Sequence, residues 1–300
     1  MTFDFSRTSR VLPSGRTAYF GKQIGTTQAE FLIGNRTTYQ DNFGIYNINI
    51  SPGLIYQPQD YVDKFGFWAQ FIYPTARAES RGSFMCLNTY DRAKFTFSFM
   101  QYAAHVPNGD FVIFMRKLLA LENANQYFPR LELISNRIHY RRDNGTFVQL
   151  ETDNSTKGLM DYLNPTLTEV DEQELICAAR LVHWAANDPA HRAIQVETAV
   201  DHFQKNMIAY NRRFSLEGVP ANVCQLICDI RHQGRGTNDR IAFALNTNGN
   251  FDKAFSNLCT IGEVNFQSRI DTVRKTIKEL STNGNWNKRY RAETNTFVDA

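Results

Sequence analysis

The hydrophobic pattern of the chain changes at Gln57, and this change limits the possible folds more than any other feature. Before it, EFLIG and FGIYNINISPG are short apolar runs that end in turn residues, as β-strands do. After it, Tyr61, Phe65, Trp68 and Ile72 recur at helical spacing and share one face of a helix. The sequence therefore predicts an α+β fold, mostly helical, because later segments such as VDEQELICAARLVHWAA and SRIDTVRKTIKELS also read as helices.

Turn and proline signals divide the first helical region. Pro74 would kink the helix or begin a new one, which places Glu79 near a last helical turn just before Gly82. Residues 84–99 predict a small hairpin or sheet, and DFVIFMRKLLALE predicts a helix with Asp110 in its first turn. The alternation on either side of Asp143-Asn144-Gly145 predicts a hairpin.

These signals suggest three parts. Residues 1–56 form a strand-bearing extension, and residues 57–280 form one main domain with a hairpin insertion at about 130–157. Residues 281–300 are polar and predict a loosely held tail. A chain of 300 residues with 42% hydrophobic content can bury the core that such a domain needs.

Composition argues against several partners. Lys and Arg exceed Asp and Glu by 33 − 30 = 3, a surplus too small to suggest nucleic acid. No apolar run approaches the roughly 18 residues of a membrane span, and the amino end lacks the apolar core of a secretory signal. We therefore expect a protein that is made in the cytoplasm and has no membrane span.

Cysteine and histidine spacing predicts no metal site and no cofactor. The five cysteines contain no C-x-x-C pair, and Cys224 and Cys228 share a helical face on which we expect them to be buried. His183, His191 and His202 are eight and eleven residues apart and form no H-E-x-x-H pattern. Signatures of serine hydrolases, P-loop enzymes and dinucleotide-binding proteins are also missing from the sequence.

Three residues in the segment 78–105 could carry glycoside hydrolysis, which needs a protonated carboxylic acid and usually a second carboxylate. Glu79 follows an aromatic-rich helix, and burial against aromatic walls would raise its pKa. Asp91 in a polar turn would stay ionised and could hold the attacking water, to which Thr96 could offer its hydroxyl. The alternative, that Glu79 and Asp91 are ordinary surface charges, remains open on spacing alone.

The order of motifs in this segment resembles the lysozyme superfamily, most closely goose-type lysozymes and soluble lytic transglycosylases. Those families carry Glu-Ser at the end of a helix, then a short sheet, then Gly-Leu-Met-Gln, and the goose type places Asp-Arg between them. The chain has Glu79-Ser80, Asp91-Arg92 and Ser98-Phe99-Met100-Gln101, with Ser98 in place of the glycine. The order of Glu79, Asp91 and Thr96 also resembles phage-type lysozymes.

The resemblance implies a lysozyme-like core with a small sheet beside a sugar cleft. It implies that Glu79 is the general acid and that Met100 and Gln101 shape the floor of the cleft, with Ser98 as a further substrate-binding residue. Lytic transglycosylases need no carboxylate to activate water, so Asp91 favours hydrolysis.

Other side chains could also contact the sugar. Tyr90 and Tyr102 could stack on sugar rings or belong to the core. A late helix of the superfamily can line the cleft, which makes Asp229, His232 and Gln233 possible sugar contacts. The same residues could instead be a simple helix end capped by Gly234.

The leading hypothesis is a muramidase-like hydrolase that cuts peptidoglycan strands between N-acetylmuramic acid and N-acetylglucosamine. Without a secretory signal, it would reach the periplasm and cell wall through a phage lysis system, a phage tail or an injection apparatus, and an injected toxin would need an immunity protein. A lytic transglycosylase and a chitosanase-like glycosidase are the alternative enzymes. From another class, the chain could be a non-catalytic sugar-binding or structural subunit.

Overall fold

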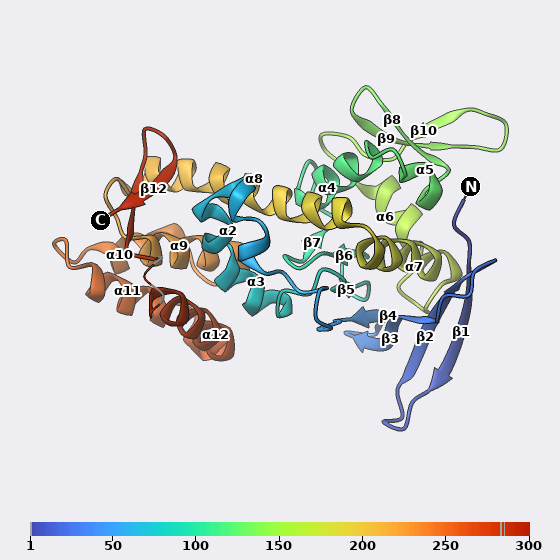
Figure 1. Ribbon diagram of the computed structural model, residues 1–300, viewed down its shortest axis with the longest axis horizontal. Coiled ribbons are helices and arrows are strands. Elements are labelled where there is room, and N and C mark those ends of the chain that lie inside the picture. The colour runs from blue at the N-terminus through green and yellow to red at the C-terminus, as the bar shows by residue number, and fades with distance from the viewer. Residues whose placement is uncertain (1, 283, 285) are drawn as a thin grey trace. The chain divides into compact units, whose positions relative to one another are not determined.

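The computed structural model of the chain describes residues 2–282, 284 and 286–300 (Figure 1). Residue 1 of the predicted extension and residues 283 and 285 of the predicted tail lie outside the described residues. The chain divides into two compact units, of which unit 1 contains Met1–Ile55 and Ser83–Thr198 and unit 2 contains Tyr56–Gly82 and Ala199–Ala300. The boundaries of these units differ from those of the predicted extension, main domain and tail.

Unit 1 is built on an antiparallel sheet of seven strands in the order β1-β2-β3-β4-β5-β6-β7. The first four strands are the longer ones: β1 (Phe5–Val11), β2 (Thr17–Gln23), β3 (Phe31–Tyr39) and β4 (Asn42–Asn47). The last three have two residues each: β5 (Leu87–Asn88), β6 (Thr96–Phe97) and β7 (Tyr102–Ala103). The predicted small sheet after residue 84 is thus confirmed, but it continues the N-terminal sheet.

The junction between β4 and β5 joins the predicted extension to the rest of unit 1. Tyr46 pairs with Asn88 and Asn47 pairs with Leu87 across it. A Cβ atom at Gly44 would stand 2.6 Å from Thr89 Oγ1, so only glycine lets the two segments approach this closely. Since β4 gains its hydrogen-bonding partner from residues 87–88, the first 55 residues are part of the unit and not an appendage.

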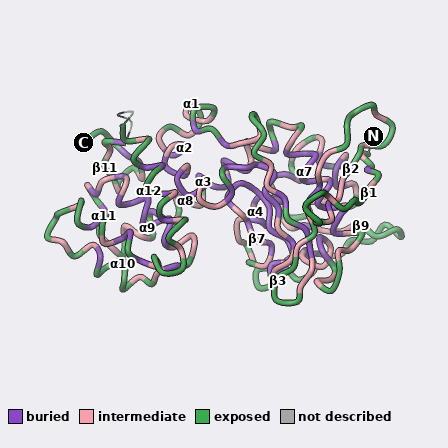
Figure 2. The backbone as a smooth tube through the Cα atoms, turned by 90° about the horizontal axis from the view of Figure 1, so that it is seen from below, coloured by how far each residue is buried: buried purple, intermediate pink, exposed green. Residues whose placement is uncertain are grey.

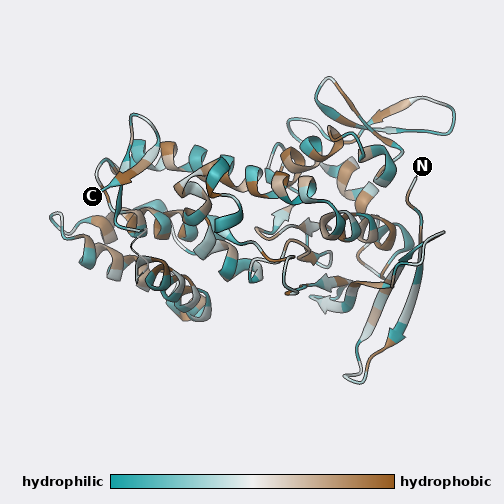
Figure 3. Cartoon of the chain, viewed as in Figure 1, coloured by the Kyte–Doolittle hydropathy of each residue, from teal (hydrophilic) through white to brown (hydrophobic). Residues whose placement is uncertain are grey.

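The remainder of unit 1 is a second sheet with helices. The sheet, in the order β10-β9-β8, consists of β8 (Leu131–Ile134), β9 (Arg137–Arg141) and β10 (Phe147–Gln149), which confirms the hairpin at Asp143–Gly145. The helices are α4 (Asp110–Leu119), α5 (Ala124–Tyr127), α6 (Lys157–Leu163), α7 (Glu172–Asn187) and the first part of α8 (Pro189–Phe214). Helix α4 buries one apolar face, and Figure 3 shows apolar and polar residues alternating along the helices.

Unit 2 is mainly helical. Its elements are η1 (Pro58–Asp60), α1 (Val62–Phe65), α2 (Phe67–Phe71), α3 (Tyr73–Ser80), the rest of α8, α9 (Ala221–Gln233), α10 (Asn238–Leu245), α11 (Phe251–Thr260) and α12 (Glu263–Thr282), with a kink at Phe266. Helices α3 and α12 lie side by side. In α9, every residue from Val223 to Ile230 is buried (Figure 2). Pro74 stands in the first turn of α3, which confirms that it begins a new helix.

The predicted loose tail is wrong. Strands β11 (Lys288–Arg291) and β12 (Thr296–Asp299) form an antiparallel hairpin within unit 2. Trp286, Tyr290 and Phe297 are buried, and the Phe297 ring lies 4.7 Å from that of Phe71. Three large aromatic side chains placed among polar neighbours supply the apolar area that anchors the segment.

The α+β class is confirmed, with 45% of the chain in helices and 20% in strands. Among the described residues, no helix combines the length and the apolar character needed to cross a membrane. All five cysteines are buried free thiols, as expected for Cys224 and Cys228.

Candidate active site

Glu79 is the second-last residue of α3, and the local sequence fixes where this helix ends. Arg81 adopts the left-handed conformation with φ of 56°, and Gly82 follows with φ of 80°. Their amides bond back into the helix, Arg81 N to Arg77 O at 3.0 Å and Gly82 N to Ala76 O at 3.1 Å. A carboxylate in the last turn meets the negative end of the helix dipole and needs cationic neighbours.

Two cationic side chains meet the Glu79 carboxylate. Arg269 Nη1 of α12 lies 2.9 Å from Glu79 Oε1, and His232 Nε2 of α9 lies 3.2 Å from the same oxygen. The Glu79 side chain is 15% exposed. The nearest approach of each cation is to Oε1. The two contacts fix the position of a carboxylate whose side chain is not fully buried.

The sequence predicted a raised pKa for Glu79, and this prediction is wrong because the pKa is lowered overall. Burial does raise it, but the hydrogen bond and charge of His232 and the charge of Arg269 outweigh burial and place the pKa of Glu79 below its ordinary value. For His232, burial lowers the pKa, yet the hydrogen bond and charge of Glu79 raise it overall. Glu79 is therefore a carboxylate whose neighbour, His232, readily carries a proton.

Asp229 stands behind this pair and does not contact solvent, so the expectation that it touches a sugar is wrong. Its side chain is fully buried and pairs with Arg269 at 2.8 Å and with Arg235 at 3.0 Å. Thr75 of α3 donates its hydroxyl to Asp229 Oδ1 at 3.1 Å. Burial raises the pKa of Asp229, but the two guanidinium groups outweigh burial and hold it below its ordinary value. We call Glu79, Asp229, His232, Arg235 and Arg269 the ionic cluster.

Sequence reasoning missed both arginines of the ionic cluster. Arg235 lies in the loop after α9, and Arg269 lies on α12, 190 positions after Glu79. Asp229 follows the apolar run VCQLIC, and this context was the available signal, because an acidic group on a buried helix face requires a cationic partner. Gln233 is the last residue of α9, and Gly234 caps this helix in the left-handed conformation, which confirms the simple helix end.

Asp91 and Thr96 belong to unit 1, whereas Glu79 belongs to unit 2. The Asp91 carboxylate accepts hydrogen bonds from Ala93 N at 2.8 Å and from Asn88 Nδ2 at 3.1 Å. Asn88 of β5 also pairs with Thr96 of β6. Asn88, which was not predicted as a site residue, therefore connects Asp91 with Thr96. Their roles with the attacking water stay predictions.

The Ser98–Gln101 segment forms a tight turn. Ser98 has φ of 96°, a conformation that favours glycine. Gln101 N donates to Ser98 O at 3.0 Å, and Gln101 itself has φ of 58°. The side chains of Ser98 and Met100 are buried, so only their backbone could face a ligand, and their contact with a sugar stays a prediction. Gln101 is half-buried and stays a predicted contact.

The two tyrosines differ. Tyr102 is buried and donates its hydroxyl to Gln195 O at 2.6 Å, which makes it a core residue and not a stacking platform. Tyr90 is half-buried and lies 6.3 Å from the Tyr39 ring, so it stays a predicted contact.

No set of three or more His, Cys, Asp or Glu side chains in residues 2–282, 284 and 286–300 could hold a metal ion. Comparisons of the chain with models of protein families, with curated proteins and with solved structures gave no match.

Proposed function

We propose that the protein is a glycoside hydrolase of the lysozyme type, with Glu79 as its catalytic carboxylate and peptidoglycan strands as its substrate. The observation that carries the proposal is the fixed position of the partly accessible Glu79 carboxylate. Arg269 and His232 hold it at 2.9 and 3.2 Å, and the side chain is 15% exposed. A fixed carboxylate that a ligand can reach meets the positioning requirement of acid–base catalysis.

The proton for the leaving group would come from the Glu79–His232 pair. His232 has a raised pKa and carries the proton that the ionised carboxylate lacks. When a sugar excludes water, a neutral pair becomes more favourable relative to an ion pair, since desolvation penalises charge. Activity is then expected to fall as the pH rises through the pKa of His232, because the pair loses its proton.

The motif order supports peptidoglycan as the substrate class. Glu79-Ser80, Asp91-Arg92 and Met100-Gln101 follow one another as in goose-type lysozymes, and Ser98 stands in a backbone conformation that favours glycine. Access to the wall through a phage or injection apparatus is part of the proposal.

A second candidate, a non-catalytic sugar-binding or structural subunit, is favoured by a different observation. The ionic cluster ties α3, α9 and α12 together, and its charges are mutually compensated. A cluster of this kind can serve stability alone.

The decisive experiment follows the turbidity of purified peptidoglycan with wild-type protein and with Glu79→Gln, which keeps the shape of the side chain. Glu174→Gln is the matched control, since Glu174 is a fully buried glutamate of unit 1, outside the ionic cluster. We expect clearing by the wild type and the control, and a loss of about 100-fold or more with Glu79→Gln.

Mass analysis of the soluble products separates the enzyme classes. Reducing disaccharide peptides would identify a hydrolase, and anhydro-muropeptides would identify a lytic transglycosylase. Equal clearing by wild type and Glu79→Gln would contradict the role of Glu79. Binding to peptidoglycan without clearing by any variant would favour the non-catalytic subunit.

A further inference from the structure

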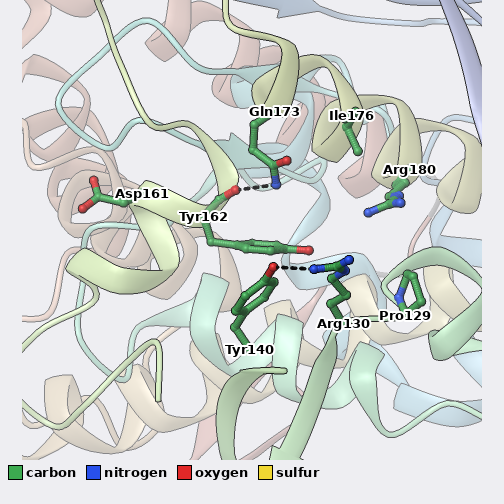
Figure 4. A pocket seen from close by; sticks show the side chains of 8 residues that line it. All are labelled: Pro129, Arg130, Tyr140, Asp161, Tyr162, Gln173, Ile176 and Arg180. Atoms are coloured by element: carbon green, nitrogen blue, oxygen red, sulfur yellow. Dashed lines mark hydrogen bonds between the residues drawn. The ribbon is translucent and has the colours of Figure 1, made fainter. Parts of the chain in front are cut away.

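Unit 1 contains a pocket of about 460 Å³, and none of its lining residues belongs to the ionic cluster, which is part of unit 2 (Figure 4). Strand β9 contributes Tyr140 to its wall, helix α6 contributes Tyr162, and helix α7 contributes Gln173 and Arg180. Arg130, which directly precedes β8, also lines the pocket. This volume falls in the range of about 300–1,000 Å³ that small-molecule sites occupy.

The pocket has an excess of positive charge. Arg180 forms no ion pair with any described residue, and its Nε is buried without a hydrogen-bond partner. Arg130 donates to the Tyr140 hydroxyl at 2.9 Å and pairs with Asp143, which is 85% exposed. Asp161 is the one carboxylate of the lining, and it is engaged by Lys157 and by Lys94 at 2.7 Å. Arg180 is half-buried and its buried Nε lacks a hydrogen-bond partner, so Arg180 would gain most from an anionic ligand.

The rest of the lining suits a ring with polar substituents. The rings of Tyr140 and Tyr162 lie 5.7 Å apart at 50° to each other. Figure 4 shows the Tyr162 hydroxyl pointing toward the two arginines. Gln173 uses its Nε2 on Tyr162 O at 2.9 Å, which leaves its amide oxygen as an acceptor on the wall. Aromatic faces beside a few polar groups are the usual lining for a sugar ring.

We propose that this pocket binds a sugar ring that carries a carboxylate, with Arg180 and Arg130 on the carboxylate and Tyr162 against the ring. The carboxylate class follows from the pocket, whereas the choice of N-acetylmuramic acid as the sugar rests on the proposed function. The site would hold a wall fragment independently of Glu79.

Two sugars with the same ring test the proposal. N-acetylmuramic acid and N-acetylglucosamine differ by the lactyl group, which carries the carboxylate, and D-lactate tests that group alone. Ligand-observed NMR titrations of the full chain measure the three dissociation constants. We expect N-acetylmuramic acid to bind at least about tenfold more tightly than either of the other two.

Variants locate the binding. Arg180→Gln should weaken binding of N-acetylmuramic acid by about 10- to 100-fold, because it removes a charge-assisted hydrogen bond. Tyr162→Phe removes only a hydroxyl and should weaken it less. Arg240→Gln removes an equal charge from an exposed position on α10 and should change nothing.

Equal binding of both sugars, or unchanged binding in Arg180→Gln, would overturn the pocket proposal. Its failure is distinguishable from failure of the proposed function, since wall clearing depends on Glu79 and these titrations involve no cleavage. Tight binding of D-lactate alone would show that the pocket takes a simple carboxylate and would overturn the assignment to a sugar.

Discussion

Ser98 holds a backbone conformation that costs every residue except glycine conformational free energy. Its φ of 96° lies in the left-handed half of the map, and its hydroxyl accepts a hydrogen bond from Met100 N at 3.2 Å. The turn thus keeps its shape although its most suitable residue is missing, and the hydroxyl offsets part of the strain.

The strain at Ser98 can be measured with two variants that both lack the hydroxyl. Ser98→Ala keeps the Cβ atom and Ser98→Gly removes it, so the difference between them reports the strain. We expect Ser98→Gly to have the higher free energy of unfolding in urea, by about 1 kcal/mol. Equal free energies for the two variants would contradict a strained turn.

Glu174 is the second unusual residue, because the pKa of its carboxyl lies well above the ordinary value. It is buried in the first turn of α7, where it contacts the Thr89 hydroxyl and the Asp171 amide. Burial raises the pKa of Glu174 from 4.5 to about 7, and its hydrogen bonds from Thr89 and from backbone amides oppose this only in part.

The Glu174 carboxyl predicts a pH-dependent stability. The native state keeps the proton up to about pH 7, while the unfolded chain releases it near 4.5, so the free energy of unfolding falls as the pH rises through this window. The loss should approach about 3 kcal/mol. Glu174→Gln should flatten this part of a urea-unfolding series taken from pH 4 to pH 8. An unchanged slope in the variant would assign the pH dependence to other groups.

At the scale of elements, Asp229 connects the three helices that surround Glu79. It sits on α9, receives the Thr75 hydroxyl from α3, and pairs with Arg269 of α12 and Arg235 of the loop after α9. Gln225 of α9 donates in turn to Thr75 at 2.9 Å. The helices are therefore joined by polar contacts where ordinary packing would use apolar side chains.

Asp229→Asn should lower the free energy of unfolding by about 3 kcal/mol or more, because it leaves two buried guanidinium groups with one carboxylate fewer. Urea unfolding measures the change, and Asp239→Asn at an exposed position of α10 is the control. A loss below about 1 kcal/mol would mean that Arg235 and Arg269 find other partners. If activity falls while the fold survives, Asp229 acts by positioning Arg269.

At the scale of the whole molecule, residues 56–82 leave unit 1 and return to it at neighbouring points. Ile55 and Ser83 are antiparallel bridge partners, and Phe84 N donates to Leu54 O at 3.0 Å. Ile55 and Ser83, which flank residues 56–82, are thus close enough for a tight turn to join them.

A shortened chain of residues 1–198, with Asn-Gly in place of 56–82, should fold as unit 1 alone. We expect a cooperative thermal transition and dispersed amide resonances by NMR. The control is residues 1–198 with 56–82 retained, which should aggregate because Trp68, Phe71 and Ile72 lose their partners in residues 199–300. An unfolded shortened chain would show that unit 1 depends on the rest of the protein.

The sequence predicts local structure better than it predicts which segments associate. Pro74 and Asp110 mark helix starts correctly, since capping and proline geometry are local effects. The pairing of β4 with β5 was not predictable, because strands of two residues carry no periodic signal. The hairpin at the C-terminus was missed because its few aromatic residues stand among polar ones.

The candidate site shows the same limit. Glu79 stood out by its position at a helix end, but its pKa depends on Arg269, which lies 190 positions away. A pKa is set by neighbours in space, so its direction could not be read from adjacent residues. His232 was named as a sugar contact, and the structure gives it a carboxylate partner within unit 2.

The five buried thiols can report where the structure opens locally. Cys86 and Cys177 lie in unit 1, and Cys224, Cys228 and Cys259 lie in unit 2. A thiol reagent can modify each of them only after the surrounding structure opens, so the rate of modification at each cysteine gives the opening free energy at that place. Identifying the modified cysteines by mass spectrometry would reveal which of the two units opens first, without an added label.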